Sequence, residues 1–536
     1  MVERGRMGDV ELSNPIAGEA KQREADDHEE EEEEEEEHIP DDGLFFPTSR
    51  DECIDLLKYL AGKQENRRQP PPGPIDSSES PFEKPFARPL PPFRFWIDFV
   101  AVCLMGGFLG LFGVGYVRVI TEVPKAWYSA DGNDNFPEDE STLSWAAGRV
   151  WWIGVGAACG IITGFFKALT DMDEFPGLIK EIRSGHVEPW MSMRVTGLAI
   201  IAQMGGACVG PEAGLGSAGA TTGHYTGRIM AHFKLIRPRD IRFYVIAGIC
   251  ASLSPFLPTP FLAVLLCVEG GIPLGDAVWK GRSPMNTLIL WTAASSCSYA
   301  VYYSLYPHTI IDPLKLQFLG FDTRQITIYD FLIGILFGIM GSFLALSYVL
   351  ISGITGKIFR ALKDLIEPRL GRRPRIFIMC TIGGILYGVL MYVFPMVLGS
   401  GQEILNNITG IPWTLGQTGL LVASSFVKLL SYWICAHCGM VGGLLLPILL
   451  VGTMWGILFS VWTDVNYILA VSCGFVSLCA AIVPLPALLI VMSYMCFTLG
   501  QQGFFPIFTC AFAAYLCFTG IGVPQTLLEL TNKKKE

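Results

Sequence analysis

The sequence predicts an all-α polytopic membrane protein whose helices are broken and tilted. Of its 536 residues, 51% are hydrophobic and only 17% are charged, and the mean hydropathy is +0.41. This composition is typical of a chain embedded in a lipid bilayer rather than of a soluble globule. Many of its apolar segments are cut by glycine or proline, and broken helices occur at membrane depth only where they line a cavity or pack within protein. The pattern therefore favours a channel or transporter over a simple helical bundle.

Residues 1–92 differ in composition from the rest of the chain. They hold 25 Asp and Glu against 11 Lys and Arg, including the unbroken run Glu29–Glu37, and they end in a proline-rich stretch. Because like charges repel and few apolar side chains are available for burial, we expect these residues to form a disordered cytoplasmic tail. A solvated tether is favoured over a specific binding site for the acidic run. The remainder holds 25 acidic and 28 basic residues, so nothing in the charge pattern indicates nucleic-acid binding.

Residues 93–536 form the predicted transmembrane domain. A simple span requires about 20 apolar residues, and segments of that kind lie at about 94–120, 149–170, 283–303, 328–355, 373–394 and 415–434. Shorter apolar segments cut by Gly or Pro lie at 174–185, 193–209, 212–230, 240–254, 258–269, 443–462, 466–483, 485–499, 504–520 and 524–531. We expect many of the shorter segments to be helices that cross only part of the bilayer.

The interrupted pattern occurs twice along the chain. A glycine-rich break at 205–219 is matched by Gly442-Gly-Leu-Leu-Leu-Pro447, and the two halves, about 94–305 and 328–533, are nearly equal in length. Interrupted segments at corresponding places of two halves are typical of inverted-repeat transporters, whose binding site lies near the middle of the bilayer. The sequence therefore predicts approximate inverted repeats with a site near the middle of the bilayer.

The distribution of Lys and Arg predicts the orientation of the chain. Basic residues gather in the predicted loops 231–242 and 356–375, before the first span and after the last one. Short loops rich in Lys and Arg stay in the cytoplasm, so these segments and both termini should be cytoplasmic. The acidic loop 121–148 should face the opposite side. We therefore expect an integral multi-pass membrane protein, and the pattern does not indicate which membrane holds it.

Glu212 is the single charged residue in the glycine-rich segment 205–219. A carboxylate at membrane depth costs about 2.5 kcal/mol or more on insertion scales, which makes it a functional candidate. Stabilisation of a helix dipole contributes only about 0.3–1 kcal/mol, less than that cost. Backbone N–H groups left free at a helix N-terminus bind anions. We predict that ionised Glu212 occupies such an anion position, from which a permeant anion or a proton displaces it.

With these features, most of residues 94–536 resemble the CLC family of chloride channels and proton/anion exchangers. Gly210-Pro-Glu-Ala-Gly214 resembles the family's G-[K/R]-E-G-P segment, which puts Glu212 at the gating glutamate. Gly442–Pro447 resembles the G-G-x-F-x-P segment, with Leu445 in place of the phenylalanine. Further similar segments are Pro258-Thr-Pro260 followed by Glu269, Leu398-Gly-Ser-Gly401 and Phe518-Thr-Gly520.

The chain also departs from the family pattern. The family's Gly-Ser-Gly-Ile-Pro segment falls at Met172-Asp-Glu-Phe-Pro176, with Asp173 at the serine position, and the tyrosine of the last helix aligns with Thr526. Many exchangers of the family carry protons on a second glutamate, but the residue after Glu269 is Gly270, which cannot titrate. Because the sequence ends at Glu536, we expect none of the paired cytoplasmic nucleotide-binding domains that many eukaryotic members carry.

The resemblance implies a set of site residues around Glu212. Backbone donors come from Leu444, Leu445 and Leu446, whose side chains form an apolar constriction. Asp173 has two interpretations. It lies beside the bound anion, which is unfavourable for a carboxylate unless it is protonated or turned away, or it is only a helix N-cap. Gly442 and Gly443 are structural near the pathway, as is Glu269, which we expect to bond to helix N-termini. The implied anion-binding residues are Gly210, Pro211, Ala213, Leu444, Leu445, Asp173 and Thr526.

The sequence favours a passive or weakly proton-coupled channel for a chloride-like anion, gated by Glu212. One alternative is a proton-coupled exchanger in which Asp173 or Glu269 replaces the missing inner carboxylate; another is a transport-inactive membrane scaffold or regulator. An enzyme is not expected, because the spans lack a Ser/His pair, an HExxH motif and paired aspartates. No cofactor or metal is expected, since Cys435 and Cys438 lack a second ligand pair. The expected partners are a small inorganic anion, the lipid bilayer and, from the resemblance, a second copy of the chain.

Overall fold

The computed structural model describes residues 92–128, 150–173, 187–236, 240–271, 283–307, 328–463, 465–483, 485–497 and 500–520. Within these ranges the regular structure is helical, apart from one isolated bridge between Gly210 and Gly443. Except for Pro92, the predicted tail 1–92 lies outside the described residues. The short segments predicted at 174–185 and 524–531 also lie outside them.

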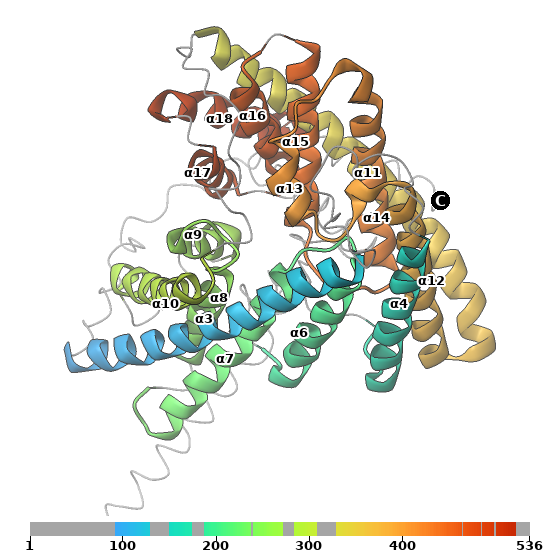
Figure 1. The fold of residues 1–536 in the computed structure, drawn as a ribbon. Coiled ribbons are helices and arrows are strands. Elements are labelled where there is room, and N and C mark those ends of the chain that lie inside the picture. The colour runs from blue at the N-terminus through green and yellow to red at the C-terminus, as the bar shows by residue number, and fades with distance from the viewer. Residues whose placement is uncertain are drawn as a thin grey trace, which may run out of the picture. The chain divides into compact units, whose positions relative to one another are not determined.

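The described helices follow the order of the predicted apolar segments (Figure 1). In the first half they are α3 (Pro92–Tyr128), α4 (Trp151–Thr170), α6 (Pro189–Met204), α7 (Glu212–His232), α8 (Ile241–Leu253), α9 (Pro260–Gly271) and α10 (Pro284–Leu305). In the second half they are α11 (Ile328–Leu370), α12 (Arg372–Val393), α13 (Gln402–Ile408), α14 (Thr418–His437), α15 (Leu445–Trp462), α16 (Tyr467–Ile482), α17 (Pro486–Cys496) and α18 (Gly500–Tyr515). Short 3-10 turns at Pro395–Val397 and Leu415–Gln417 and a π-helical turn at Leu516–Gly520 complete the order.

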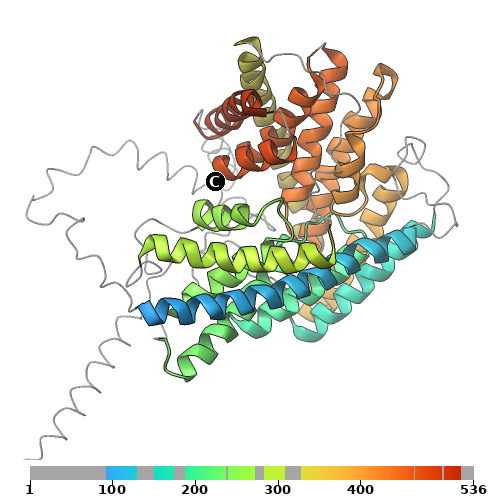
Figure 2. The ribbon, with the colours of Figure 1, turned by 60° about the vertical axis from the view of Figure 1, so that its left-hand side comes forward.

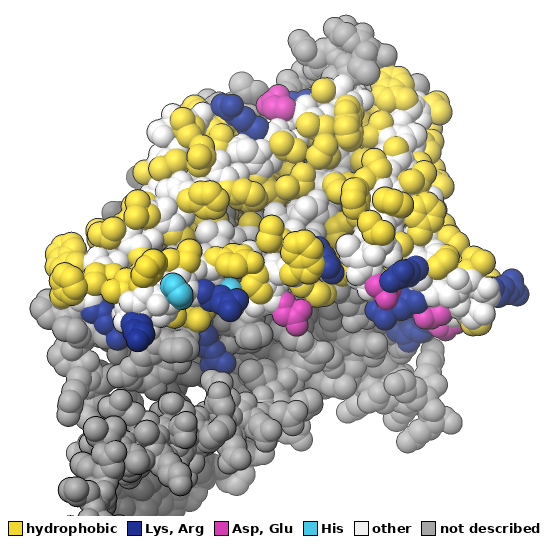
Figure 3. All heavy atoms as spheres, turned by 90° about the horizontal axis from the view of Figure 1, so that it is seen from below, with side chains coloured by type: hydrophobic (Ala, Val, Ile, Leu, Met, Phe, Trp, Pro, Cys, Tyr) yellow, Lys and Arg dark blue, Asp and Glu magenta, His cyan; other side chains and the backbone are white. Residues whose placement is uncertain are grey.

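Among the described residues, six helices are long and apolar enough to cross a membrane: α3, α4, α11, α12, α14 and α15. Two expectations change. The segment at 443–462 is long enough to span as α15, whereas α10 is not among the six, because its Ser, Thr and Tyr side chains lower its hydropathy. Seen from below, the described surface is largely apolar, with Lys and Arg toward its edges (Figure 3). The chain is an integral multi-pass membrane protein.

The two halves repeat the same helix packing. In the first half α7 packs on α8 and α3 packs on α10; in the second half α15 packs on α16 and α11 packs on α18. Two further pairs join the halves, because α4 packs on α12 and α9 packs on α17. Figure 1 shows α4 beside α12, and Figure 2 shows the long α3 running beside α10. Corresponding pairs of helices therefore pack together in both halves, as a repeat requires.

Two predicted loops are partly helical. Helix α11 continues to Leu370 and α12 begins at Arg372, so the basic segment 356–375 is mostly helix. Gly371 separates the two helices with a φ of 83°, a left-handed conformation that favours glycine. Helix α11 has 43 residues, and at about 1.5 Å per residue it is longer than a bilayer core of about 30 Å. Its charged end therefore continues beyond the apolar layer. Similarly, residues 121–128 of the predicted loop 121–148 belong to α3.

The crossing of α4 and α12 depends on glycine at the contact. A Cβ atom on Gly160 would lie 2.6 Å from the carbonyl oxygen of Cys380 and 2.8 Å from Cα of Gly384. Small residues at such crossings allow two helix backbones to approach closely in a membrane. Gly154, on the same helix, has no atom within 4 Å of the place where its Cβ would lie. Glycine is therefore required by packing at position 160 and not at position 154.

Gly160→Ala is expected to lower the unfolding temperature of the detergent-purified protein, because overpacking costs about 1–3 kcal/mol. Gly154→Ala is the matched control. It is expected to leave the unfolding temperature unchanged or raise it, since alanine favours a helix by about 0.8–1 kcal/mol over glycine. Thermal unfolding of the two variants side by side tests the crossing. Equal unfolding temperatures for the two variants would show that the helices do not meet as closely as described.

Candidate functional site

The two glycine-rich breaks meet in the structure. The Gly210 N–H donates to the Gly443 carbonyl at 2.7 Å, and the Gly443 N–H donates to the Gly210 carbonyl at 2.8 Å. Gly210 lies two residues before α7, and Gly443 lies two residues before α15. The bridge therefore brings the N-termini of both helices together. These ends carry N–H groups without intrahelical partners and the positive end of the helix dipole, so both favour an anion.

Side chains of α3, α6 and α12 donate hydrogen bonds to backbone carbonyls of the irregular segment between α6 and α7. The Gln203 side-chain amide donates to the Gly210 carbonyl at 2.9 Å. The hydroxyls of Tyr128 and Tyr387 both donate to the Gly205 carbonyl, at 2.7 and 3.1 Å. Buried backbone carbonyls need such partners, because no water reaches them. The break is therefore held in one conformation by α3 and α12 as well as by its own chain.

Glu212 is the first residue of α7, and its carboxylate reaches the start of α15. Its Oε1 accepts the Leu446 N–H at 3.3 Å, and the side chain is almost fully buried, with 1% of the residue exposed. Oε2 has no hydrogen-bond partner among the described residues. The carboxylate thus lies at the N-terminus of α15 with one of its two oxygens unpaired.

The glycines leave the space that this carboxylate occupies. A Cβ atom on Gly210 or on Gly443 would lie 2.6 Å from Cδ of Glu212, which is closer than van der Waals contact allows. On Gly442, a Cβ atom would lie 2.5 Å from Cβ of Val209. Glycine at these positions therefore serves close packing of the two breaks, and at two of them it also makes room for the Glu212 side chain.

Most of the predicted anion-binding residues lie at this junction. Pro211 and Ala213 flank Glu212 and are buried, and Leu444 and Leu445 are buried at the start of α15. With Gly210 and the glycines of the second break, they form one cluster around the carboxylate. Thr526 lies outside the described residues, so the structure does not place it.

Asp173 lies in a different environment from the one around Glu212. Its carboxylate pairs with Arg375 at the start of α12, and Arg375 also pairs with Glu367 at 2.7 Å. The Asp173 carbonyl accepts a hydrogen bond from Nζ of Lys167 at 3.0 Å, and the same ammonium donates to the Gly439 carbonyl at 3.0 Å. The charge of the carboxylate is therefore balanced by a guanidinium instead of being left to repel an anion.

Glu269 caps a helix of the other half. Its Oε1 accepts the Ala487 N–H at 2.9 Å, and its Oε2 accepts the Leu488 N–H at 2.8 Å. Both residues belong to the first turn of α17, which begins at Pro486. The expected hydrogen bonding of Glu269 to a helix N-terminus is confirmed. Both carboxylate oxygens are engaged in this cap.

Sequence reasoning missed two buried lysines, Lys167 in α4 and Lys428 in α14. Nζ of Lys428 donates to the carbonyls of Val397, Leu398 and Gly399 at 3.0, 3.4 and 2.8 Å. No carboxylate pairs with Lys428 among the described residues, and three peptide carbonyls accept hydrogen bonds from its ammonium. Both lysines lie within apolar segments of the sequence. A charged residue in such a segment is itself a signal of a functional or structural site.

Helix N-termini that converge on a buried carboxylate, within a repeat of broken apolar helices, define a membrane protein that transports anions. The family described as voltage-gated chloride channel matches residues 155–519, and the chain belongs to this CLC family. A putative chloride channel protein, ClcB-like, from Ralstonia nicotianae is 24% identical over 346 residues, which cover 62% of this chain and 72% of that relative.

Two solved structures share the fold. A slow cyanobacterial Cl-/H+ antiporter superposes with a TM-score of 0.61 at 16% identity, covering 81% of this chain and 97% of that one. A CLC-type fluoride/proton antiporter superposes with a TM-score of 0.54 at 14% identity, covering 80% of this chain and 97% of that one. At these identities the likeness concerns the fold alone, and it agrees with the predicted CLC-like repeat.

Proposed function

We propose that this chain is a passive or weakly proton-coupled channel for chloride or a similar small anion, gated by Glu212. The observation that carries the proposal is the position of the Glu212 carboxylate at the N-terminus of α15. A permeant anion would use the same N–H groups and the same positive helix ends. Ionised Glu212 therefore acts as a tethered competitor, and conduction requires that it leave.

The contacts of Glu212 favour easy displacement. The Leu446 N–H donates to Oε1 at 3.3 Å, and Oε2 has no hydrogen-bond partner among the described residues. Protonation removes the negative charge that the helix ends attract, so the neutral side chain competes less well with an anion. Anion flux should therefore rise as the pH falls. The buried side chains of Leu444 and Leu445 supply an apolar wall, while their backbones supply the donors.

A proton-coupled exchanger is the second candidate, because two solved structures with this fold are described as proton antiporters. Gly270 counts against it, since glycine cannot carry a proton, and the adjacent Glu269 uses both oxygens to cap α17. Asp173 and Glu269 remain the candidates for a replacement relay. A transport-inactive scaffold is the third candidate, and complete absence of flux would favour it.

The coupling test uses purified protein in liposomes that hold a chloride gradient, with valinomycin setting the potential. A chloride electrode and a pH electrode then record both ions at once. We expect anion flux with few or no protons moved uphill, because the chain lacks the second glutamate. Uphill proton movement at a fixed ratio would instead establish the exchanger, and Asp173→Asn and Glu269→Gln would then identify its relay.

We also propose that residues 1–92 form a disordered cytoplasmic tail that folding and permeation do not need. A chain that starts at Phe82 keeps Lys84, Arg88 and Arg94, so its orientation signal is preserved. It is expected to insert and conduct like the full chain. Single-channel current should differ between the two chains only at low ionic strength, where the acidic tail repels anions over more than about 10 Å. Failure of the shortened chain to fold would show that the tail packs on the membrane domain.

The proposed orientation places both termini in the cytoplasm, and the face where α3 ends and α4 begins on the opposite, outer side. The basic residues around the junction of α11 and α12 support this assignment, because Lys and Arg gather in the cytoplasmic segments of membrane proteins.

By family resemblance, we propose that two copies of the chain assemble as a homodimer.

A further inference from the structure

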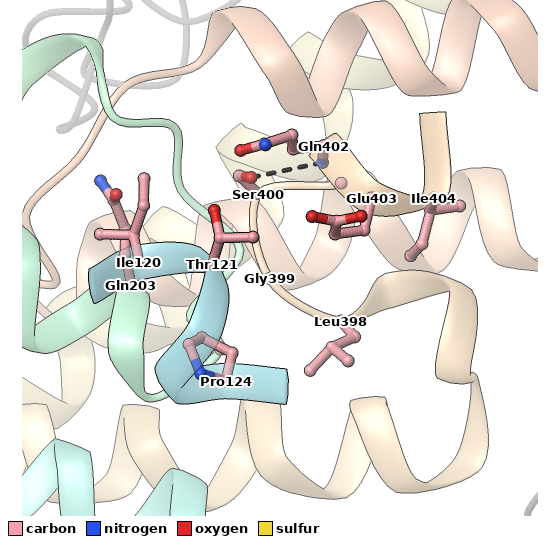
Figure 4. Close-up of a pocket in the computed structure, with 12 residues that line it drawn as sticks. Ile120, Thr121, Pro124, Gln203, Leu398, Gly399, Ser400, Gln402, Glu403 and Ile404 are labelled. Atoms are coloured by element: carbon pink, nitrogen blue, oxygen red, sulfur yellow. Dashed lines mark hydrogen bonds between the residues drawn. The ribbon is translucent and has the colours of Figure 1, made fainter. Parts of the chain in front are cut away.

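A small cavity lined by both polar and apolar groups lies between the C-terminal end of α3 and the turn that precedes α13 (Figure 4). Its volume is about 40 Å³, enough for about three water-sized molecules. Three of its walls come from the end of α3, from the break after α6 and from the turn Leu398–Gly401. The lining residues are Ile120, Thr121, Pro124, Gln203, Gly206, Leu398, Gly399, Ser400, Gly401, Gln402, Glu403 and Ile404.

Two hydroxyl groups in this cavity have protons to donate and no acceptor among the described residues. Thr121 is 5% exposed, and its Oγ1 has no hydrogen-bond partner. Figure 4 shows this hydroxyl pointing toward Ser400. Oγ of Ser400 accepts the Gln402 N–H at 3.3 Å, which leaves its own proton available. A buried polar group without a partner, such as the Thr121 hydroxyl, is rare in proteins and calls for a bound ion or water.

The charges around the cavity favour an anion over a cation. Lys428 lies behind the turn Leu398–Gly401, and its ammonium engages the carbonyls of Val397, Leu398 and Gly399. Each of these oxygens therefore already accepts one hydrogen bond from a cationic group. No carboxylate balances Lys428 among the described residues. The Glu403 carboxylate, which lines the cavity, pairs with Lys125 at 3.5 Å and so adds little net charge.

We propose that this cavity is a second anion site, for a small inorganic anion such as chloride that keeps part of its hydration. The proposal rests on the proposed function, because the cavity would collect the same ion that the channel conducts. Gln203 links the two sites, since it lines the cavity and its amide donates to the Gly210 carbonyl. The cavity lies on the proposed outer side, so it holds an arriving anion next to the Glu212 gate.

The test measures flux as a function of outer chloride concentration in Thr121→Val and Ser400→Ala. A lost hydrogen bond to an ion should raise the half-saturating concentration about five- to tenfold in each variant and leave the maximal flux unchanged. Thr381→Val is the matched control, because the Thr381 hydroxyl donates to the Phe377 carbonyl of its own helix, outside the cavity. This variant should behave like the parent.

Calorimetric titration of the purified full-length protein with bromide provides a readout that does not require transport. The parent and Thr381→Val should show a binding event that Thr121→Val weakens by the same five- to tenfold. Normal flux with an unchanged half-saturating concentration in both cavity variants would overturn the cavity site alone. Binding of rubidium in place of bromide would also overturn it. Absence of flux in the parent would overturn the proposed function, while the titration would still decide the cavity.

Discussion

Glu212→Ala is expected to raise anion flux about tenfold at low anion concentration and to abolish most of its pH dependence. The carboxylate now accepts the Leu446 N–H, and a hydrogen bond to a charged group contributes about 1.5–3 kcal/mol. At the lower end of this range, removal of a competitor held by about 1.5 kcal/mol increases the occupancy of the site by the permeant anion about tenfold. Flux into chloride-loaded liposomes, measured from pH 5 to pH 8, checks both expectations.

Glu212→Gln tests whether the negative charge or the size of the Glu212 side chain blocks the anion. The glutamine side chain is as long as that of glutamate but carries no negative charge for the helix ends to attract. If the charge is the competitor, this variant should conduct like Glu212→Ala at every pH. If bulk alone blocks the path, it should conduct like the parent at neutral pH. A Glu212→Ala protein with the pH profile of the parent would show that Glu212 is not the gate.

Lys428→Met is expected to lower the free energy of unfolding by about 3 kcal/mol. The substitution keeps the length of the side chain but leaves the carbonyls of Val397, Leu398 and Gly399 without their donor. Each buried carbonyl left without a hydrogen-bond partner destabilises the variant by about 1–3 kcal/mol. Part of this loss is offset, because the variant does not have to transfer a charged ammonium from water into the protein interior when it folds. Denaturation in mixed detergent micelles measures the change.

Lys357→Met is the matched control, because Lys357 is exposed on α11. Substitutions at exposed positions away from special features usually change stability by less than about 0.5 kcal/mol. The two variants remove the same charge and introduce the same side chain, so only burial and bonding differ. Equal stability of both variants would show that the ammonium of Lys428 does not hold the turn at Leu398–Gly401.

The sequence alone predicted the centre of the site because its signals are local. A single carboxylate among glycines at membrane depth has few explanations, and the second break at Gly442 lies at the corresponding place of the other half. The structure brings these breaks together through the hydrogen bonds between Gly210 and Gly443. The sequence predicted that the glycines of the two breaks allow close packing. It did not predict that Gly210 and Gly443 also leave space for the Glu212 carboxylate, because that contact depends on the folded structure.

The features that were missed depend on contacts between distant parts of the chain. Asp173 and Arg375 are separated by 202 positions, so their pairing has no local signature. Lys428 was visible as a charge in an apolar segment, but its acceptors lie in a turn about 30 residues earlier. The extent of α11 was missed because hydropathy reports the bilayer, whereas the helix continues into charged residues that are good helix formers.

The most direct measurement is the position of bromide in crystals of the parent and of Glu212→Gln, grown at neutral pH and located by anomalous scattering. If Glu212 competes with the permeant anion, bromide should lie within hydrogen-bond distance of the Leu446 N–H in Glu212→Gln, where Oε1 now lies. The parent should show no bromide at that place. Bromide at the α15 N-terminus of the parent beside an unmoved carboxylate, or at neither protein's α15 N-terminus, would contradict the proposal that Glu212 occupies an anion site.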